Sequence, residues 1–248
     1  MMKRILIACG LLLAARNAFT QGLVLFYLRV SGTSHIYAPN PSSPSLSMIG
    51  QGPNDAVPSG TTDWSGWTPI GGNGLTGQYG AQSTFTSLLG APGSNAAEST
   101  LLPGALGTAL GGGTATTFRT GTAAGANARQ TATFNNIAPD ASIGSFEVVA
   151  WDNSSGLYST WSLAEPAWES GLIAAGKSGE FNIKNVGGNM YPPAVLFPYN
   201  DDTTTQMRSF NLYFIPEPTM AALAALSAGL WLLGRHRSHA RRVAALRE

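Results

Sequence analysis

The sequence predicts an all-β fold, namely a single antiparallel β-sandwich of jelly-roll or immunoglobulin type with long loops. Three observations support this class. Glycine accounts for 30 of the 248 residues, far above the usual ~7%. Turn-forming residues are spread through the middle of the chain, between short runs in which apolar and polar residues alternate. No helical period of convincing length appears there, and the absence of βα alternation argues against an α/β fold.

Six runs in the body of the chain, residues 21–215, have strand character. They are residues 23–30, 78–88, 129–134, 146–151, 179–184 and 208–215. Phe181 and Ile183 share one face of their run, as expected of a half-buried strand. Both faces of the run 146–151 are apolar, which predicts a strand covered on both sides. The segments 38–60 and 90–113 are rich in proline and glycine, respectively, and predict long loops that hold short extra elements.

Charge excludes one class of partner. The body carries eleven acidic residues against six basic ones, and six scattered cations cannot neutralise a row of phosphates. We therefore expect no nucleic-acid binding.

The first 20 residues have the layout of a secretory signal peptide. Lys3 and Arg4 precede an apolar run, residues 5–15, and small residues follow. Cleavage after Thr20 would place small residues at the recognised positions and remove Cys9, the only cysteine. The alternative is a first core helix.

The C-terminal region begins with an uncharged run of 15 residues, 219–233. As an α-helix it would span roughly 22 Å, short of the ~30 Å hydrocarbon core. An Arg-rich tail follows, residues 234–248, with Arg235, Arg237, Arg241 and Arg242, and such a cluster belongs on the cytoplasmic side. We predict a single transmembrane helix over 219–233; the alternative is an amphipathic helix packed on the body.

The segment "FIPEPTMAALAALSAGLWLLGRHR" resembles the PEP-CTERM sorting signal of Gram-negative bacteria. The Pro-Glu-Pro motif would be Pro216, Glu217 and Pro218, followed by the short helix and the basic tail. The family often reads Val-Pro-Glu-Pro-Ser-Thr, whereas this chain has Ile215 before the motif and Thr219-Met220 after it. Runs such as "FEVVAWD" are also similar in texture to the β-rich bodies of PEP-CTERM proteins from Verrucomicrobia-like bacteria.

This resemblance implies processing by an exosortase, a membrane-embedded cysteine peptidase. The precursor would be anchored in the inner membrane and then released or transferred to the cell surface or the extracellular matrix. The two prolines favour an extended, accessible backbone, which a peptidase could bind.

Catalytic and metal-binding chemistry has few candidates in the body. His35 is its only histidine, so a Ser-His-Asp triad would depend on that residue. An acid and base for glycoside cleavage could come only from scattered carboxylates, whose spacing selects no pair: Asp152, Glu165, Glu169, Asp201 and Asp202. Calcium at residues 152–153 or 201–202 lacks the Asp-x-Asp-x-Asp-Gly spacing. We therefore predict no catalytic residues, no metal and no cofactor.

The aromatic residues offer one tentative ligand face. Trp64 and Trp67 occur in "DWSGW", a glycine-containing loop, and could stack on sugars. Trp151, Tyr158, Trp161 and Trp168 are further candidates, although core and loop packing is the better explanation of large aromatics. The leading hypothesis is a non-enzymatic exported protein. The alternatives are a carbohydrate-binding module on extracellular polysaccharide and a secreted glycoside hydrolase.

Overall fold

Strands dominate the structure, a computed structural model that describes residues 21–107, 110, 113–197 and 206–216. The strands are β1 Gly22–Phe26, β2 Ile36–Tyr37, β3 Thr84–Pro92, β4 Leu102–Pro103, β5 Ala105–Leu106, β6 Gln130–Phe134, β7 Ile143–Asp152, β8 Ala175–Lys177, β9 Phe181–Lys184, β10 Ala194–Val195 and β11 Phe210–Asn211. The helical elements are η2 Glu98–Thr100, η4 Gly121–Ala123 and α2 Trp161–Glu169. The predicted β-rich class is confirmed.

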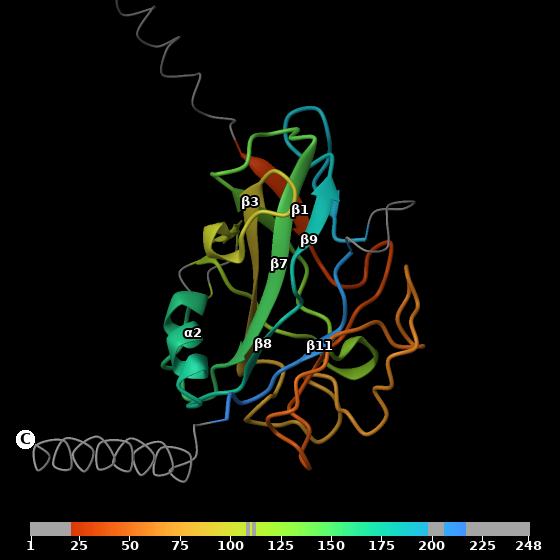
Figure 1. Cartoon of the computed structure of the whole chain (residues 1–248), viewed down its shortest axis with the longest axis vertical. Helices are drawn as coiled ribbons and strands as arrows, with labels where there is room; N and C mark the ends of the chain where they lie inside the picture. Colours follow the sequence, from red (N-terminus) through yellow and green to blue (C-terminus); the bar gives the residue numbers. More distant parts are fainter. Residues whose placement is uncertain (1–20, 108–109, 111–112, 198–205, 217–248) are drawn as a thin grey trace, which may run out of the picture. The chain divides into compact units, whose positions relative to one another are not determined.

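Two larger sheets organise the body. One has the order β10-β1-β6-β5, and the other has the order β4-β3-β7-β8 with β9 also paired to β7. The long strands β3 and β7 pair antiparallel along their whole length, from Thr84 opposite Asp152 to Pro92 opposite Gly144. Figure 1 shows these two strands side by side, with α2 next to one end of them.

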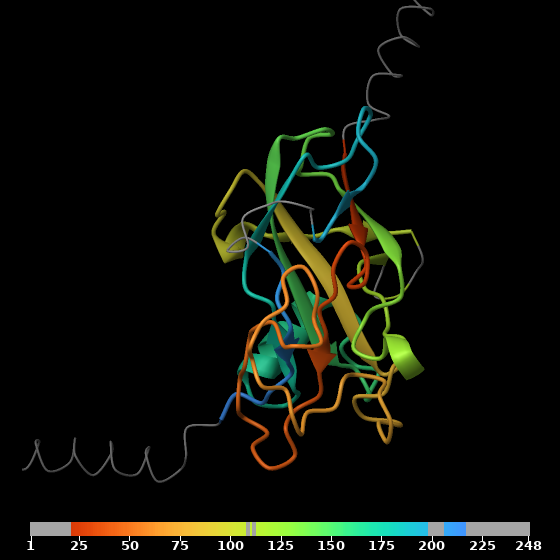
Figure 2. The same cartoon turned by 90° about the vertical axis from the view of Figure 1, so that its right-hand side faces the viewer.

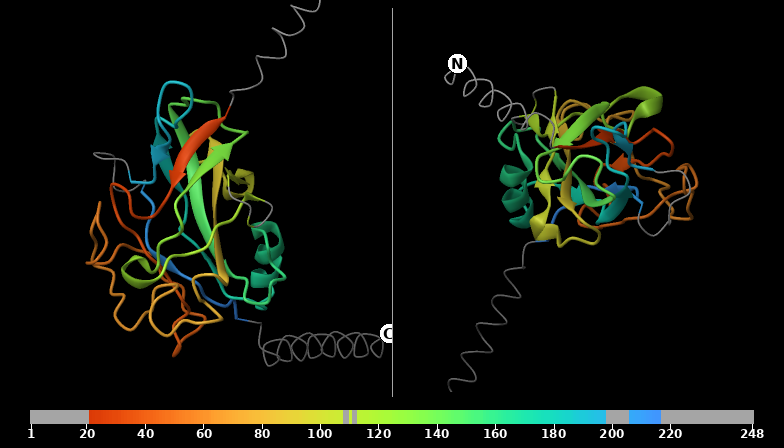
Figure 3. Two further views of the ribbon diagram at one scale, coloured as in Figure 1. Left: turned by 180° about the vertical axis from the view of Figure 1, so that it is seen from behind. Right: turned by 90° about the horizontal axis from the view of Figure 1, so that it is seen from above.

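The main core is one buried cluster that joins side chains of the two larger sheets. Phe134 of β6 contacts Phe146 of β7 edge to face, with ring centroids 5.3 Å apart. Val24 and Phe26 of β1 belong to the same buried cluster. The left view of Figure 3 shows β1 in front of the β3–β7 pair, and Figure 2 shows β1 to one side of it. Gly90 is required at this contact, because a Cβ there would come within 2.8 Å of both the Phe134 and Phe146 rings.

Several strand predictions are confirmed, and others need correction. The run 146–151 lies inside β7, where nine of the ten residues are buried, including those of both faces, as expected. The weakly alternating run 78–88 overlaps β3, which begins and ends later in the chain than predicted. Within the run 208–215, only the two residues of β11 form a strand. The purely antiparallel arrangement is wrong, since β1 pairs with β10 and β2 with β11 in parallel. Long connections allow these late segments to return alongside early strands.

Helix α2 is an element that the sequence reading missed. It begins after the extended residue Thr160 and buries Trp161, Ala164, Ala167 and Trp168 on one side. This i, i+3, i+7 spacing is helical, but it covers only nine residues and Pro166 interrupts it. Gly171, at a φ of +71°, follows the helix and suits the left-handed conformation common after helix ends.

The two targeting predictions fall outside the described residues. The signal peptide, residues 1–20, and the helix over 219–233 are not among them, and neither is the basic tail. Within the described ranges, no helix has the length and hydropathy that a membrane crossing requires.

Candidate functional site

The outer face of the β3–β7–β8 sheet carries a hollow. Side chains alternate along β7, so Glu147 faces away from the core that its neighbours Phe146 and Val148 enter. Its cross-strand partner on β3 is Leu89, which shares the same outer face. Helix α2 and the short turn η2 lie over this face and form the walls of a pocket.

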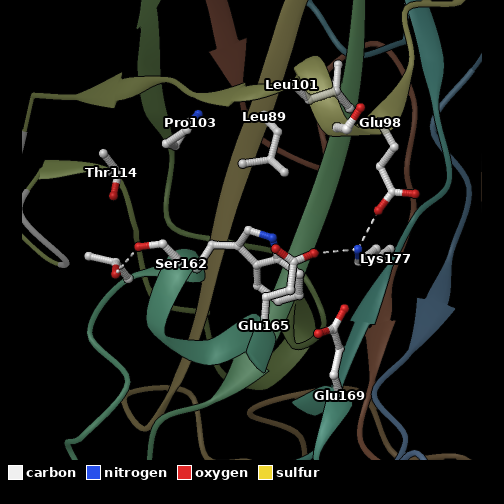
Figure 4. Close-up of a pocket in the computed structure, with 12 residues that line it drawn as sticks. Leu89, Glu98, Leu101, Pro103, Thr114, Ser162, Glu165, Glu169 and Lys177 are labelled. Atoms are coloured by element: carbon white, nitrogen blue, oxygen red, sulfur yellow. Dashed lines mark hydrogen bonds and ion pairs between the residues drawn. The ribbon is translucent and has the colours of Figure 1, made fainter. Parts of the chain in front are cut away.

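This pocket, here called the Lys177 pocket, has a volume of about 810 Å³. Its lining combines apolar side chains, hydroxyls, three carboxylates and one ammonium (Figure 4). The lining residues are Leu89, Glu98, Ser99, Leu101, Pro103, Thr114, Thr160, Trp161, Ser162, Glu165, Glu169 and Lys177. Its volume is within the ~300–1,000 Å³ range of small-molecule sites.

Lys177 links the walls of the pocket. Its Nζ donates to Glu165 Oε1 of α2 at 2.8 Å and also to Glu98 Oε1 of η2. The same ammonium lies 5.3 Å and 5.4 Å from the ring centroids of Trp161 and Trp168, within cation–π range. Burial lowers the pKa of Lys177, but the two carboxylates outweigh it and hold that pKa above its usual value. The lysine therefore remains charged.

Glu147 lies beneath this pocket and is only 2% exposed. Burial, reinforced by repulsion from Glu98, raises its pKa to about 7, although Lys177 opposes the shift. Its Oε2 atom has no hydrogen-bond partner among the described residues. A buried carboxylate with a strongly shifted pKa is a common feature of functional sites.

The sequence-predicted aromatic face forms a second, smaller hollow, here called the Trp67 hollow. Its volume is about 310 Å³. Trp64 and Trp67 both line it and meet edge to face at 5.5 Å between centroids. Trp64 itself is buried, stacks on Tyr37 at 4.2 Å, and donates its indole N–H to the Gly50 carbonyl. Only Trp67 of the pair is partly exposed.

Polar groups also reach the Trp67 hollow. Asn54, Asp63 and Ser65 contribute to its lining. Asp63 accepts the backbone N–H of Ser65 at 2.8 Å, and the backbone and hydroxyl of Ser65 lower the pKa of that carboxyl. Asp63 is therefore ionised at neutral pH and can accept hydrogen bonds.

His35 and Asp152, which the sequence offered as catalytic candidates, make hydrogen bonds that support the fold. His35 Nδ1 contacts Asp55 Oδ1 at 2.6 Å, while Ser209 Oγ donates to the other oxygen of Asp55. The carboxylate thus lies between the histidine and the serine, whereas a triad requires the histidine between them. Asp152 accepts the N–H of Ser154 and the side chain of Gln78, as a turn residue would.

Metal binding has no support in the described part of the chain, where no group of three or more potential ligands converges. Asp201, Asp202, Glu217 and Pro218 lie outside the described residues, as do all four tail arginines. Pro216 is the last described residue and is exposed.

Sequence reasoning named several members of the Lys177 pocket but not the pocket. Trp161, Glu165 and Glu169 appeared as separate candidates, whereas Glu98, Glu147 and Lys177 were missed. One available signal was the rarity of lysine, because Lys177 and Lys184 are the only lysines in the body.

Comparisons of the chain with protein families, with curated proteins and with solved structures found no match.

Proposed function

We propose that the chain is an exported surface protein whose β-rich body binds neutral carbohydrate at the Trp67 hollow without catalysis. The observation that carries this proposal is the placement of Trp67 beside Asp63 and Asn54 in one hollow. An aromatic ring covers the apolar face of a sugar, while carboxylate and amide groups bond its hydroxyls. We further infer that the two larger sheets pack face to face as a β-sandwich, which holds this hollow on a rigid frame.

Trp64 and Trp67 take different roles in this proposal. Trp67 is the stacking ring, because it is partly exposed. Trp64 is a positioning residue, since its stacking on Tyr37 and its bond to the Gly50 carbonyl fix it beneath the hollow. Burial and the nearby Asp55 carboxylate raise the pKa of Tyr37, so its ring stays neutral.

Binding of neutral gluco- and galacto-oligosaccharides to the full-length chain tests this role. Trp67→Ala should weaken binding by at least about tenfold, as expected when a central aromatic contact is lost. Tyr191→Ala is the matched control, because Tyr191 is an aromatic 45% exposed that does not line the hollow. Equal affinities of the two variants would refute the site.

Export and sorting are supported by the sequence of the two ends. The N-terminal layout is that of a signal peptide, and the C-terminal segment resembles a PEP-CTERM signal. We propose that an exosortase cleaves near Pro216–Pro218 after insertion in the inner membrane. Mass spectrometry of surface material tests this, since a chain that remains intact through Glu248 would rule out processing.

A glycoside hydrolase is the weaker alternative. A glycosidase needs a carboxyl group that can give a proton to the leaving group, but Glu98 and Glu165 are both occupied by the Lys177 ammonium. Glu147 is protonated more readily, but its Oε2 is buried. We therefore propose a binding role, and turnover of any polysaccharide by the full-length chain would overturn it.

A further inference from the structure

The Lys177 pocket has a chemistry distinct from that of the Trp67 hollow. Three carboxylates line it against one ammonium, so the pocket is net negative. Figure 4 shows the carboxyl groups of Glu98, Glu165 and Glu169 gathered around the Lys177 ammonium. Such a pocket repels acidic ligands and attracts cations.

The hydrogen bonds of Lys177 leave some acceptor positions of these three carboxylates unused. Its ammonium binds Glu98 and Glu165, and each carboxylate can accept further hydrogen bonds. Glu169 lies one helical turn after Glu165 on α2, is exposed, and makes no hydrogen bond or ion pair with any described residue. A second cation entering the pocket would therefore meet acceptors that are already positioned.

Glu147 provides independent evidence for a ligand. Its side chain is only 2% exposed to solvent, and its Oε2 atom has no hydrogen-bond partner among the described residues. Its side chain shares the outer face with Leu89, which lines the pocket. The charges that act on it most are those of Glu98, Lys177, Glu180 and Glu165, and three of these four line the pocket. A buried carboxyl oxygen without a partner, next to residues that line a hollow, is a polar group whose hydrogen bonding is incomplete.

We propose that the Lys177 pocket binds the primary ammonium group of an amino sugar. The carboxylates hold the ammonium, as they already hold that of Lys177. Hydroxyls such as Thr160 and Ser162, which bond each other at 3.0 Å, can exchange bonds with sugar hydroxyls. Leu89, Leu101 and Trp161 offer an apolar surface to the sugar ring. The assignment to a sugar rests on the proposed carbohydrate-binding function, whereas the requirement for an ammonium does not.

Binding of glucosamine oligomers to the full-length chain, at about pH 5.5 where the amines are charged and ordinary carboxyl groups stay ionised, tests the proposal. The same oligomers in N-acetylated form keep the sugar and remove the charge, so they should bind at least about tenfold more weakly. Glu169→Gln should weaken binding of the amine form about tenfold, since it removes a carboxylate without removing a contact of the fold. Added salt should weaken binding further.

Glu180→Gln is the matched control, because Glu180 is exposed, carries the same charge and does not line the pocket. It should change affinity by less than about twofold. Equal binding of amine and acetylated oligomers, or equal effects of the two substitutions, would overturn the inference. Failure of the proposed neutral-carbohydrate site at the Trp67 hollow would give a different result. Neutral glycans would then not bind, whereas the binding that depends on Glu169 would remain.

Discussion

The two faces of β7 are buried to the same degree but by different means. Phe146 and Val148 point into the main core, and Glu147 and Trp151 point outward under α2 and η2, yet all four are 2% exposed or less. The inner face packs in one buried cluster with side chains of β1 and β6 and holds only apolar side chains in this stretch. The outer face is covered by a helix and a loop and retains a carboxyl group. The same degree of burial therefore stabilises the fold at the inner face of β7, whereas at the outer face it accompanies a polar pocket.

The largest effect should come from the inner face. Phe146→Ala removes a fully buried ring that contacts Phe134 and lies 6.4 Å from the Phe181 ring. We expect the free energy of unfolding to fall by about 3–5 kcal/mol, because a cavity replaces the ring. Urea denaturation measures this loss. Leu157→Ala, at a leucine 70% exposed, should cost less than about 0.5 kcal/mol, and a similar cost for both would contradict the role of the inner core.

The outer face should instead show a dependence on pH. The pKa of Glu147 is raised from 4.5 to about 7, so the folded chain holds a proton that the unfolded chain releases. The contribution of Glu147 to stability is therefore fully present below pH 4.5, is lost as the pH rises through about 7, and stays absent above it. Glu147→Gln should be more stable than the wild type by on the order of 2 kcal/mol at pH 8.

Urea denaturation at pH 5 and pH 8 checks this expectation. Near pH 5 the variant and the wild type should differ little, because most of the Glu147 cost appears at higher pH. If both chains lost the same stability between the two pH values, Glu147 would not be the group responsible.

Local patterns predicted the strands better than they predicted the site. The apolar character of both faces of the run 146–151 indicated a doubly covered strand, and the alternation in 179–184 located the buried Phe181 and Ile183. The site depends instead on distant partners, since Lys177 joins Glu98, 79 positions earlier in the chain. No local spacing encodes that contact. Helix α2 was hidden for another reason, because its nine residues include Pro166, which normally disfavours a helix interior.

The smallest effect should come from the ion pairs of the outer face. Lys177→Met keeps an unbranched chain over Trp161 but removes the ammonium from Glu98 and Glu165. These partners are 52% and 35% exposed, so solvent screens the pairs and we expect a loss of about 1 kcal/mol or less, reduced further by salt. Lys184→Met is the matched control at the body's other lysine, which is exposed and outside the pocket.

Lys177→Met should also change how stability depends on pH, because Lys177 acts on Glu147 on the outer face of β7. Since the Lys177 charge lowers the pKa of Glu147, its removal should move that pKa upward, and the fall in stability should extend to higher pH than in the wild type. Lys184→Met should leave the pH profile unchanged. An identical profile for both lysine variants would mean that Lys177 does not act on the buried carboxyl, and that the outer face is held together by packing alone, as the inner face is.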